Sequence, residues 1–196
     1  MQEKRKIEKF FKEKNGLCKY SELIDLGLSQ RDVKLLKDNH VLESVGRGIY
    51  NHKDYLPDML KVYQMENQKL IYSHETAAYL HGLTDRFPRE YTVTTPSGYH
   101  LRRDKELKIY YIKKECFQLG VMELTDSLGN NIRAYDKEKT LCDIIRSKER
   151  IELQVYSEVI QNYFNGKVNM YRLSKYAKKL KISDSLMNII TLMMKP

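Results

Sequence analysis

The segment Leu28–Tyr50, LSQRDVKLLKDNHVLESVGRGIY, restricts the fold more than any other part of the chain. It starts with a helix-capping signal, because Ser29 can bond the amide of Asp32 while the Asp32 carboxylate reaches back to Ser29. A short basic helix follows, and then two strand-like runs, VLESV and GIYN, flank Gly-Arg-Gly at 46–48. A capped cationic helix joined directly to a tight hairpin indicates two elements that meet the same partner.

Two shorter helical patterns precede this segment. The first ends at Asn15-Gly16, and the second, KYSELIDLG, ends at Gly27, since glycine is the usual residue just past a helix. The apolar positions of the three helices are Ile7, Phe10, Phe11, Leu23, Ile24, Val33 and Leu36. Three helices and a β-hairpin predict a winged helix-turn-helix over residues 1–55, with the turn at Gly27 between its second and third helices.

Residues 56–196 show mixed helix and strand patterns. Pro57 suits the first position of a helix, Ser73 and Asp136 are predicted helix caps, and the domain boundary is placed near Tyr55. Predicted helices cover 57–68, 73–82, 136–146, 152–165, about 169–181 and about 184–194, and predicted strands cover 90–96, 107–113, 121–124 and 131–135. The predicted fold is α+β, with a mixed α/β C-terminal domain that ends in a helical segment.

The chain carries a formal net charge of +9, of which +3 falls in residues 1–55 and +6 in the remainder. Such a surplus favours phosphate backbones or anionic membrane surfaces as partners. No run approaches the roughly 18–20 apolar residues that span a bilayer, and the N-terminal charges interrupt any signal-peptide core. Three dispersed cysteines, Cys18, Cys116 and Cys142, indicate reduced thiols. We therefore expect a cytoplasmic protein that binds no membrane.

The predicted third helix and hairpin carry side chains suited to DNA. The candidate DNA-binding residues are Lys19, Tyr20, Ser29, Gln30, Arg31, Lys34, Lys37 and Arg47. In a major groove, Gln30 can pair with adenine and Arg31 with guanine, while Lys34 and Lys37 contact phosphates. Arg47 at the hairpin tip suits the negative potential of the minor groove. The alternative is that these cations only form a solvated surface beside a plain hairpin.

Two further features belong to this predicted interface. Gly46 and Gly48 would let the hairpin turn adopt positive φ and let the backbone approach its partner closely. Lys19 and Tyr20, at the start of the second helix, would face a phosphate with help from the helix N-terminus.

A second basic surface is predicted on the helix near 169–181, because no Asp or Glu occurs between Val159 and Ser183. The apolar stripe of this helix is Met170, Leu173, Ala177 and Leu180, and the cations of the second surface are Arg172, Lys175, Lys178 and Lys179. This surface could extend a DNA footprint, bind RNA or meet an acidic partner. A solvated lysine face is the alternative.

Enzyme motifs are weak in this sequence. His74 and His81 share a predicted helix, but no HExxH or Cys/His ligand spacing accompanies them. Cys142 lies beside Asp143 in an apolar ladder, which favours a core thiol. The chain has no P-loop, no GxSxG, and no Gly-Ser followed by the paired aspartates of a nucleotidyltransferase. We predict no catalytic residue, no metal and no cofactor.

Three blocks in order, YSELIDLGLSQRDVKLLKDNHVLESVGRGIY, YSHETAAYLHGLTDRFPREYTVTTP and RAYDKEKTLCDIIR, resemble the AbiEi antitoxin family. The first is similar to that family's N-terminal winged helix, whose hairpin ends in a sequence like RGIY. The second block is similar to the start of that family's second domain, where a helix is followed by a strand. The third block is similar to a segment in which a strand leads into a helix that carries a Leu-x-Asp pair. The resemblance covers nearly the whole chain.

The resemblance implies the antitoxin of a type IV toxin–antitoxin system that acts in abortive phage infection. The N-terminal domain would bind inverted repeats in its own promoter and repress the operon, with a chain that can be monomeric in solution and bind DNA cooperatively. The second domain would neutralise a cognate nucleotidyltransferase-like toxin without a stable complex. Two alternatives are a winged-helix regulator with a ligand-sensing or dimerising second domain, and an RNA-binding protein that uses the C-terminal cations.

Overall fold

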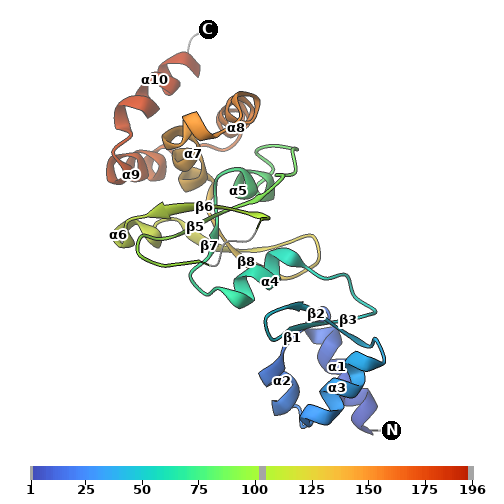
Figure 1. Ribbon diagram of the computed structural model, residues 1–196. Coiled ribbons are helices and arrows are strands. Elements are labelled where there is room, and N and C mark those ends of the chain that lie inside the picture. The colour runs from blue at the N-terminus through green and yellow to red at the C-terminus, as the bar shows by residue number, and fades with distance from the viewer. Residues whose placement is uncertain (1, 102–104, 194–196) are drawn as a thin grey trace. The chain divides into compact units, whose positions relative to one another are not determined.

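The computed structural model describes residues 2–101 and 105–193 and consists of two compact units (Figure 1). Unit 1 contains the chain up to Gln68 together with Leu124–Ile132, and unit 2 contains Lys69–Glu123 and the chain from Arg133 onward. Each unit combines helices with strands. The predicted α+β class is therefore confirmed.

The boundary between the units falls at Gln68, later in the chain than the predicted position near Tyr55. The reason is helix α4 (Met59–Glu66), which follows that position and packs on unit 1. Its Val62 is buried in one apolar cluster with Leu17 and Ile49, residues of two strands of that unit. Burial of this helix against the strands makes it part of unit 1.

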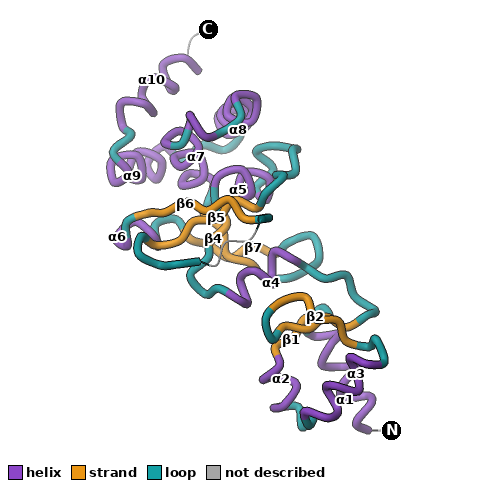
Figure 2. Tube along the Cα trace, in the orientation of Figure 1, coloured by secondary structure: helices purple, strands orange, loops and turns teal. Residues whose placement is uncertain are grey.

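Unit 1 combines helices with short strands (Figure 2). Its other elements are α1 (Gln2–Glu13), β1 (Leu17–Lys19), α2 (Tyr20–Asp25), α3 (Gln30–Asp38), β2 (Leu42–Gly46) and β3 (Ile49–His52). The strands form an antiparallel sheet in the order β1-β3-β2. A second apolar cluster joins the helices to this sheet and consists of Phe11, Cys18, Leu23, Val33 and Leu42.

Three local predictions for unit 1 need correction. Strand β1 was not expected, because three residues are too few to show a strand pattern, and it exists through its pairing with β3. Ile24 is 38% exposed although Leu23 is fully buried, since adjacent helical residues point about 100° apart and a short helix buries one side. Pro57 precedes the helix it was expected to open, and Asp58 caps that helix by accepting from the Lys61 amide (3.2 Å).

The segment 124–132 is attached to the rest of unit 1 by side-chain hydrogen bonds, one of them buried. Asn130 Nδ2 donates to Asp58 Oδ2 (2.8 Å), and Lys61 Nζ donates to the carbonyl oxygen of Asn131 (2.6 Å). Burial, together with a hydrogen bond to the neighbouring Asp126 carboxyl group, raises the pKa of Asp58 to about 6. The Asp58 carboxyl group therefore binds a proton more tightly in the folded protein than in the unfolded chain.

This raised pKa predicts a pH dependence that Asp58→Asn removes. A pKa of about 6 in the folded protein, against an ordinary 3.8, gives a contribution to stability that is full below pH 3.8 and is lost as the pH rises through 6. The contribution is roughly 2–3 kcal/mol. The free energy of unfolding, measured by urea titration from pH 4 to 7, should therefore fall more steeply for the parent protein than for the variant.

The control for this prediction is Asp25→Asn, which removes an exposed carboxylate of α2. Its pH profile should be parallel to that of the parent protein. Parallel profiles for the parent and Asp58→Asn would contradict the expected proton uptake at Asp58.

Unit 2 is built on a five-stranded mixed sheet in the order β6-β5-β4-β8-β7. The strands are β4 (Ile71–Tyr72), β5 (Tyr91–Pro96), β6 (Leu107–Ile112), β7 (Val121–Thr125) and β8 (Asn131–Tyr135), and the residues of β7 and β8 within 124–132 are counted in unit 1. The helices are α5 (His74–Leu80), α6 (Lys114–Phe117), α7 (Lys137–Arg146), a 3-10 turn (Lys148–Arg150), α8 (Leu153–Asn165), α9 (Met170–Leu180) and α10 (Ser183–Met193). Strand β4, helix α6 and the 3-10 turn were not predicted, because each is only two to four residues long.

Helices α5 and α7 pack together on one face of this sheet, and α8, α9 and α10 lie beyond them (Figure 1). Leu141, Ile144, Val159, Leu173 and Ala177 are buried in the apolar core between these helices. As predicted, Asp136 caps α7 by accepting from the Lys139 amide (2.8 Å). Among the described residues, no helix combines the length and apolarity needed to cross a bilayer.

Ser73 precedes α5 as predicted, but its side chain does not cap the helix. Its hydroxyl group instead accepts from Thr94 Oγ1 (2.8 Å) and lies 2.9 Å from His74 Nδ1. The Ser73 hydroxyl group therefore bonds to Thr94 of β5 and not to the start of α5.

Candidate nucleic-acid interface

Helix α3 presents a cationic outer face. The predicted capping box is present, with Ser29 N donating to Asp32 Oδ2 (2.9 Å) and Asp32 N donating to Ser29 Oγ (3.2 Å). The Ser29 hydroxyl group also donates to Asp32 Oδ2 (2.6 Å), and this bond together with that of the Ser29 amide lowers the pKa of Asp32. The carboxylate is thus engaged at the start of the helix. The exposed residues of the helix are Gln30, Arg31, Asp32, Lys34, Leu35, Lys37 and Asp38.

Arg31 lies on the side of α3 opposite the inward residues Val33 and Leu36, as the helical repeat requires. Leu35 lies on the same outward side and is 58% exposed. Sequence reasoning missed Leu35, although a helical projection places it beside Arg31.

The tip of the β2–β3 hairpin is a two-residue loop, Arg47-Gly48, because Gly46 and Ile49 are the last paired residues. Gly48 has φ +66°, but Gly46 does not adopt positive φ, contrary to the prediction. Gly46 lies against helix α4 instead. A Cβ atom at this position would lie 2.8 Å from Glu66 Oε1 of helix α4.

Glu66 also holds the hairpin tip directly. Its Oε1 accepts a hydrogen bond from the Arg47 amide (2.6 Å), while the Arg47 side chain remains exposed. The sequence offered no signal for this support, since 19 residues separate the two groups. The main chain of the tip is therefore anchored, and its arginine is presented outward.

The start of α2 lies next to the hairpin tip. Tyr20 N donates to the Gly48 carbonyl oxygen (2.8 Å), and Lys19 N donates to Glu22 Oε2 (2.7 Å). Glu22 also pairs with Lys14. Both amides at this helix N-terminus therefore have partners within the protein, and a carboxylate lies beside them, while the phosphate contact of Lys19 and Tyr20 stays a prediction. The half-buried side chains of Lys19 and Tyr20 still border the hairpin tip.

Tyr50 of β3 connects the predicted elements, and sequence reasoning missed it. Its ring lies 5.6 Å from Lys37 Nζ of α3, and its centroid lies 6.5 Å from that of Tyr20 in α2. Lys37, Tyr20 and the hairpin tip therefore meet around one half-buried aromatic ring. Gln30, Arg31 and Lys34 extend this surface along the exposed face of α3. We call this set, with Leu35 and Arg47, the unit 1 cationic surface.

The predicted second basic surface on α9 is only partly present. Arg172 is not a free cation, because its Nη1 lies 3.4 Å from Asp136 Oδ2 and 3.6 Å from Glu138 Oε2. Met170 is 43% exposed, and Tyr176 is buried in its place with its hydroxyl group donating to Asp136 (3.0 Å). The exposed cations that remain on this helix are Lys175, Lys178 and Lys179.

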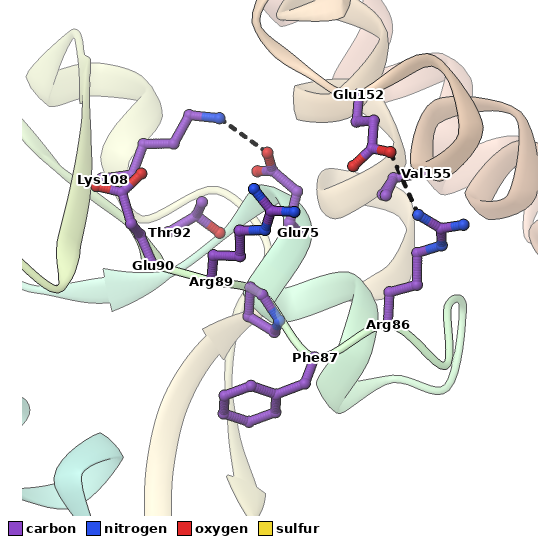
Figure 3. Close-up of a pocket in the computed structure, with 10 residues that line it drawn as sticks. Glu75, Arg86, Phe87, Arg89, Glu90, Thr92, Lys108, Glu152 and Val155 are labelled. Carbon is purple, nitrogen blue, oxygen red and sulfur yellow. Dashed lines mark hydrogen bonds and ion pairs between the residues drawn. The ribbon is translucent and has the colours of Figure 1, made fainter.

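A cavity of about 650 Å³ opens in unit 2 between α5, the segment 86–90 and α8 (Figure 3). The charges on its wall are largely paired with one another. Lys108 Nζ lies 2.9 Å from Glu75 Oε1, and Arg86 Nη1 lies 3.3 Å from Glu152 Oε1 (Figure 3). Because the cations and carboxylates compensate each other, this cavity has no clear preference for the charge of a ligand.

Comparisons with known proteins indicate a fold relative only. No family model matches the sequence, and no curated protein matches it. Among solved structures, the protein is similar to the crystal structure of the RV2827C protein from Mycobacterium tuberculosis, with a TM-score of 0.65 and 11% sequence identity. The match covers 94% of this chain and 77% of that chain. At this identity the likeness shows a shared fold alone.

Proposed function

We propose that unit 1 is a winged helix-turn-helix that binds double-stranded DNA, and that the protein is a cytoplasmic antitoxin that represses its own operon. The observation that carries the DNA-binding proposal is the convergence of α3, the Arg47 tip and the start of α2 around Tyr50. Two separate segments, α3 and the hairpin tip, thereby supply exposed cations to one surface, and the half-buried Lys19 lies beside them. A merely solvated helix needs no such convergence.

The order of elements in unit 1 supports this proposal. Helix α2 ends at Asp25 and α3 begins at Gln30, so a short turn separates them, with Gly27 at φ +103°. A helix pair joined by a short glycine-containing turn is typical of a helix-turn-helix. The hairpin β2–β3 follows α3 directly, in the position of a wing.

Each side chain of the unit 1 cationic surface has a role in the proposed complex. The N-terminal part of α3 enters the major groove, where Arg31 donates to guanine and Gln30 pairs with adenine. Leu35 contacts a thymine methyl group, while Lys34 and Lys37 contact phosphates. Arg47 lies over the minor groove. Two copies on inverted repeats would bind half-sites spaced by about 10–10.5 base pairs or a multiple of it.

The antitoxin role rests on the resemblance of the sequence to the AbiEi family. In this proposal unit 2 neutralises a nucleotidyltransferase-like toxin without forming a stable complex.

Two groups that an enzyme could use are buried in unit 2. Burial lowers the pKa of His74 to about 3 and raises the pKa of Cys142 to about 12. The His74 ring is also stacked on Tyr110, 3.5 Å between centroids. These environments favour structural roles for both side chains.

The test is an electrophoretic mobility shift of the full chain on its own upstream region and on a scrambled duplex, at about 150 mM salt. We expect a strong preference for the native promoter that Arg31→Ala greatly reduces. The matched control is Lys53→Ala, which also removes one exposed charge. Lys53 follows the last residue of β3, at the opposite end of that strand from the hairpin tip. Equal weak binding to both duplexes would overturn the autorepressor proposal and favour an RNA-binding or partner-binding role.

Substitution of Lys34 should change the salt dependence of binding rather than its sequence preference. A lysine on a phosphate releases about one counterion, so Lys34→Ala should reduce the slope of log affinity against log salt by about one unit. Binding to native and scrambled DNA should weaken alike. A salt series with fluorescence anisotropy measures this slope, and an unchanged slope would remove Lys34 from the interface.

A further inference from the structure

A second cavity of unit 2, about 410 Å³ in volume, lies where β6, α6, α7 and α9 meet at their ends. Its wall includes Lys113 before α6, Arg146 at the end of α7, and Lys179 and Lys181 at the end of α9. We infer that this cavity binds a nucleoside polyphosphate, with the phosphates on the four cations. The proposal concerns unit 2 alone and does not depend on DNA binding by unit 1.

The charge of this cavity is strongly unbalanced. Four cations face a single carboxylate on its wall, that of Glu115. Among the described residues, no ion pair involves Lys113, Lys179 or Lys181, in contrast to the paired charges of the larger cavity in Figure 3. Unpaired cations gathered in one concave site repel each other, and a multiply charged anion relieves that repulsion.

Arg146 is held in place from inside the protein. Its Nη2 lies 3.4 Å from Asp143 Oδ1, and the Asp143 side chain has no exposed surface. The other oxygen of this carboxylate accepts from Lys139 Nζ (2.5 Å), and that ammonium group lies 4.0 Å from the centroid of the Tyr135 ring. A guanidinium that is already oriented loses less side-chain entropy when it binds a phosphate. The buried pair therefore acts as a support for Arg146.

Lys181 occupies an unusual backbone position for its residue type. It has φ +59° and ψ +42° at the end of α9, and its amide donates to the Ala177 and Lys178 carbonyl oxygens. Glycine is the usual residue in this left-handed position because a side chain strains it. Strain of this kind is concentrated at functional sites. A lysine at this position indicates that its side chain is used, and its side chain lines the cavity.

An aromatic side chain and a hydroxyl group complete the site. Tyr111 is 52% exposed and lines the same cavity, so its ring offers a flat face to a nucleobase. Stacking on aromatic rings is a common way of binding bases because every base has a π-face. Ser97 adds a hydroxyl group, although its Oγ already lies 3.1 Å from the Ile112 carbonyl oxygen. Cations with an adjacent exposed ring favour a nucleotide over a simple anion.

Isothermal titration calorimetry of the full chain with ATP, GTP and inorganic tripolyphosphate, at about 150 mM salt, tests the proposal. The decisive variant is Lys181→Gly, because it removes one cation and also relieves the backbone strain. We expect it to bind ATP or GTP at least tenfold more weakly without a loss of thermal stability. The matched control is Lys175→Ala, an exposed cation on the same helix that does not line the cavity, and it should bind like the parent protein.

Tyr111→Ala separates the two parts of the ligand. We expect this variant to bind ATP and GTP more weakly and to bind tripolyphosphate with unchanged affinity. The proposal is overturned if neither nucleotides nor tripolyphosphate bind, if Lys181→Gly and Lys175→Ala weaken binding equally, or if single-stranded RNA displaces the nucleotides at far lower concentration. Arg31→Ala should leave nucleotide binding intact, so failure of this site and failure of DNA binding are distinguishable.

Discussion

Asp143→Ala should destabilise unit 2 by about 3–5 kcal/mol, because it leaves the Lys139 ammonium group in the core without a counterion. Both side chains are completely buried, and Lys139 Nζ lies 2.5 Å from Asp143 Oδ2. Burial by itself would raise the pKa of Asp143, but the positive charge of Lys139 holds that pKa below its ordinary value. The aspartate is therefore charged at neutral pH, and its loss exposes the full desolvation cost of the lysine.

The measurement is chemical denaturation of the full chain, combined with amide hydrogen exchange of α7 to localise the effect to unit 2. The control is the double replacement Lys139→Met with Asp143→Leu, which removes both charges and keeps apolar volume. A buried ion pair replaced as a whole usually costs little. The double variant should therefore be clearly more stable than Asp143→Ala. A cost below about 1 kcal/mol for Asp143→Ala would contradict a charged, enclosed Lys139.

The sign of the associated pH effect follows from the lowered pKa. A carboxyl group whose pKa is depressed on folding contributes stability above its unfolded pKa, and this contribution is lost as the pH falls through the folded value. The Asp143 contribution is thus present at neutral pH and lost in acid. Asp58 has the opposite sign, because its pKa is raised to about 6.

The second large effect is expected from Arg31→Ala combined with Arg47→Ala. Each arginine should contribute about 1–3 kcal/mol to specific DNA binding if it contacts base edges or the minor groove. Because Arg31 lies on α3 and Arg47 on the hairpin tip, the two losses should be nearly additive. The double variant should bind its own promoter about thirtyfold to twenty-thousandfold more weakly, which corresponds to about 2–6 kcal/mol.

Fluorescence anisotropy with native and scrambled duplexes measures this loss, with Lys53→Ala as the charge-matched control. Both arginine side chains are exposed, so the thermal midpoint of the double variant should stay close to that of the parent protein. Equal losses on native and scrambled DNA would reassign both arginines to phosphate contacts. If the double variant loses no more DNA affinity than Lys53→Ala, the DNA-binding surface lies elsewhere.

Local features of the fold were predictable where neighbouring residues determine them. The start of α3 follows from Ser29 and Asp32, which are three residues apart and satisfy each other's main-chain groups. The start of α7 follows from Asp136 in the same way. The exposed face of α3 followed from the helical repeat, except that Leu35 was overlooked. The hairpin around Arg47 was predictable because its turn glycine and flanking strands are contiguous.

The sequence by itself determined the α+β class, the caps of these helices and the cations that α3 exposes, because each depends on residues within a turn or two of chain. Only the tertiary structure decided which cations of the chain are paired, which are held in place and which gather at one site. It pairs Arg172 with Asp136, anchors the Arg47 tip through Glu66, and gathers Arg146 and Lys181 around one cavity. Ion pairing depends on distances of a few ångströms between residues that lie far apart in the chain, and only packing brings them within that range.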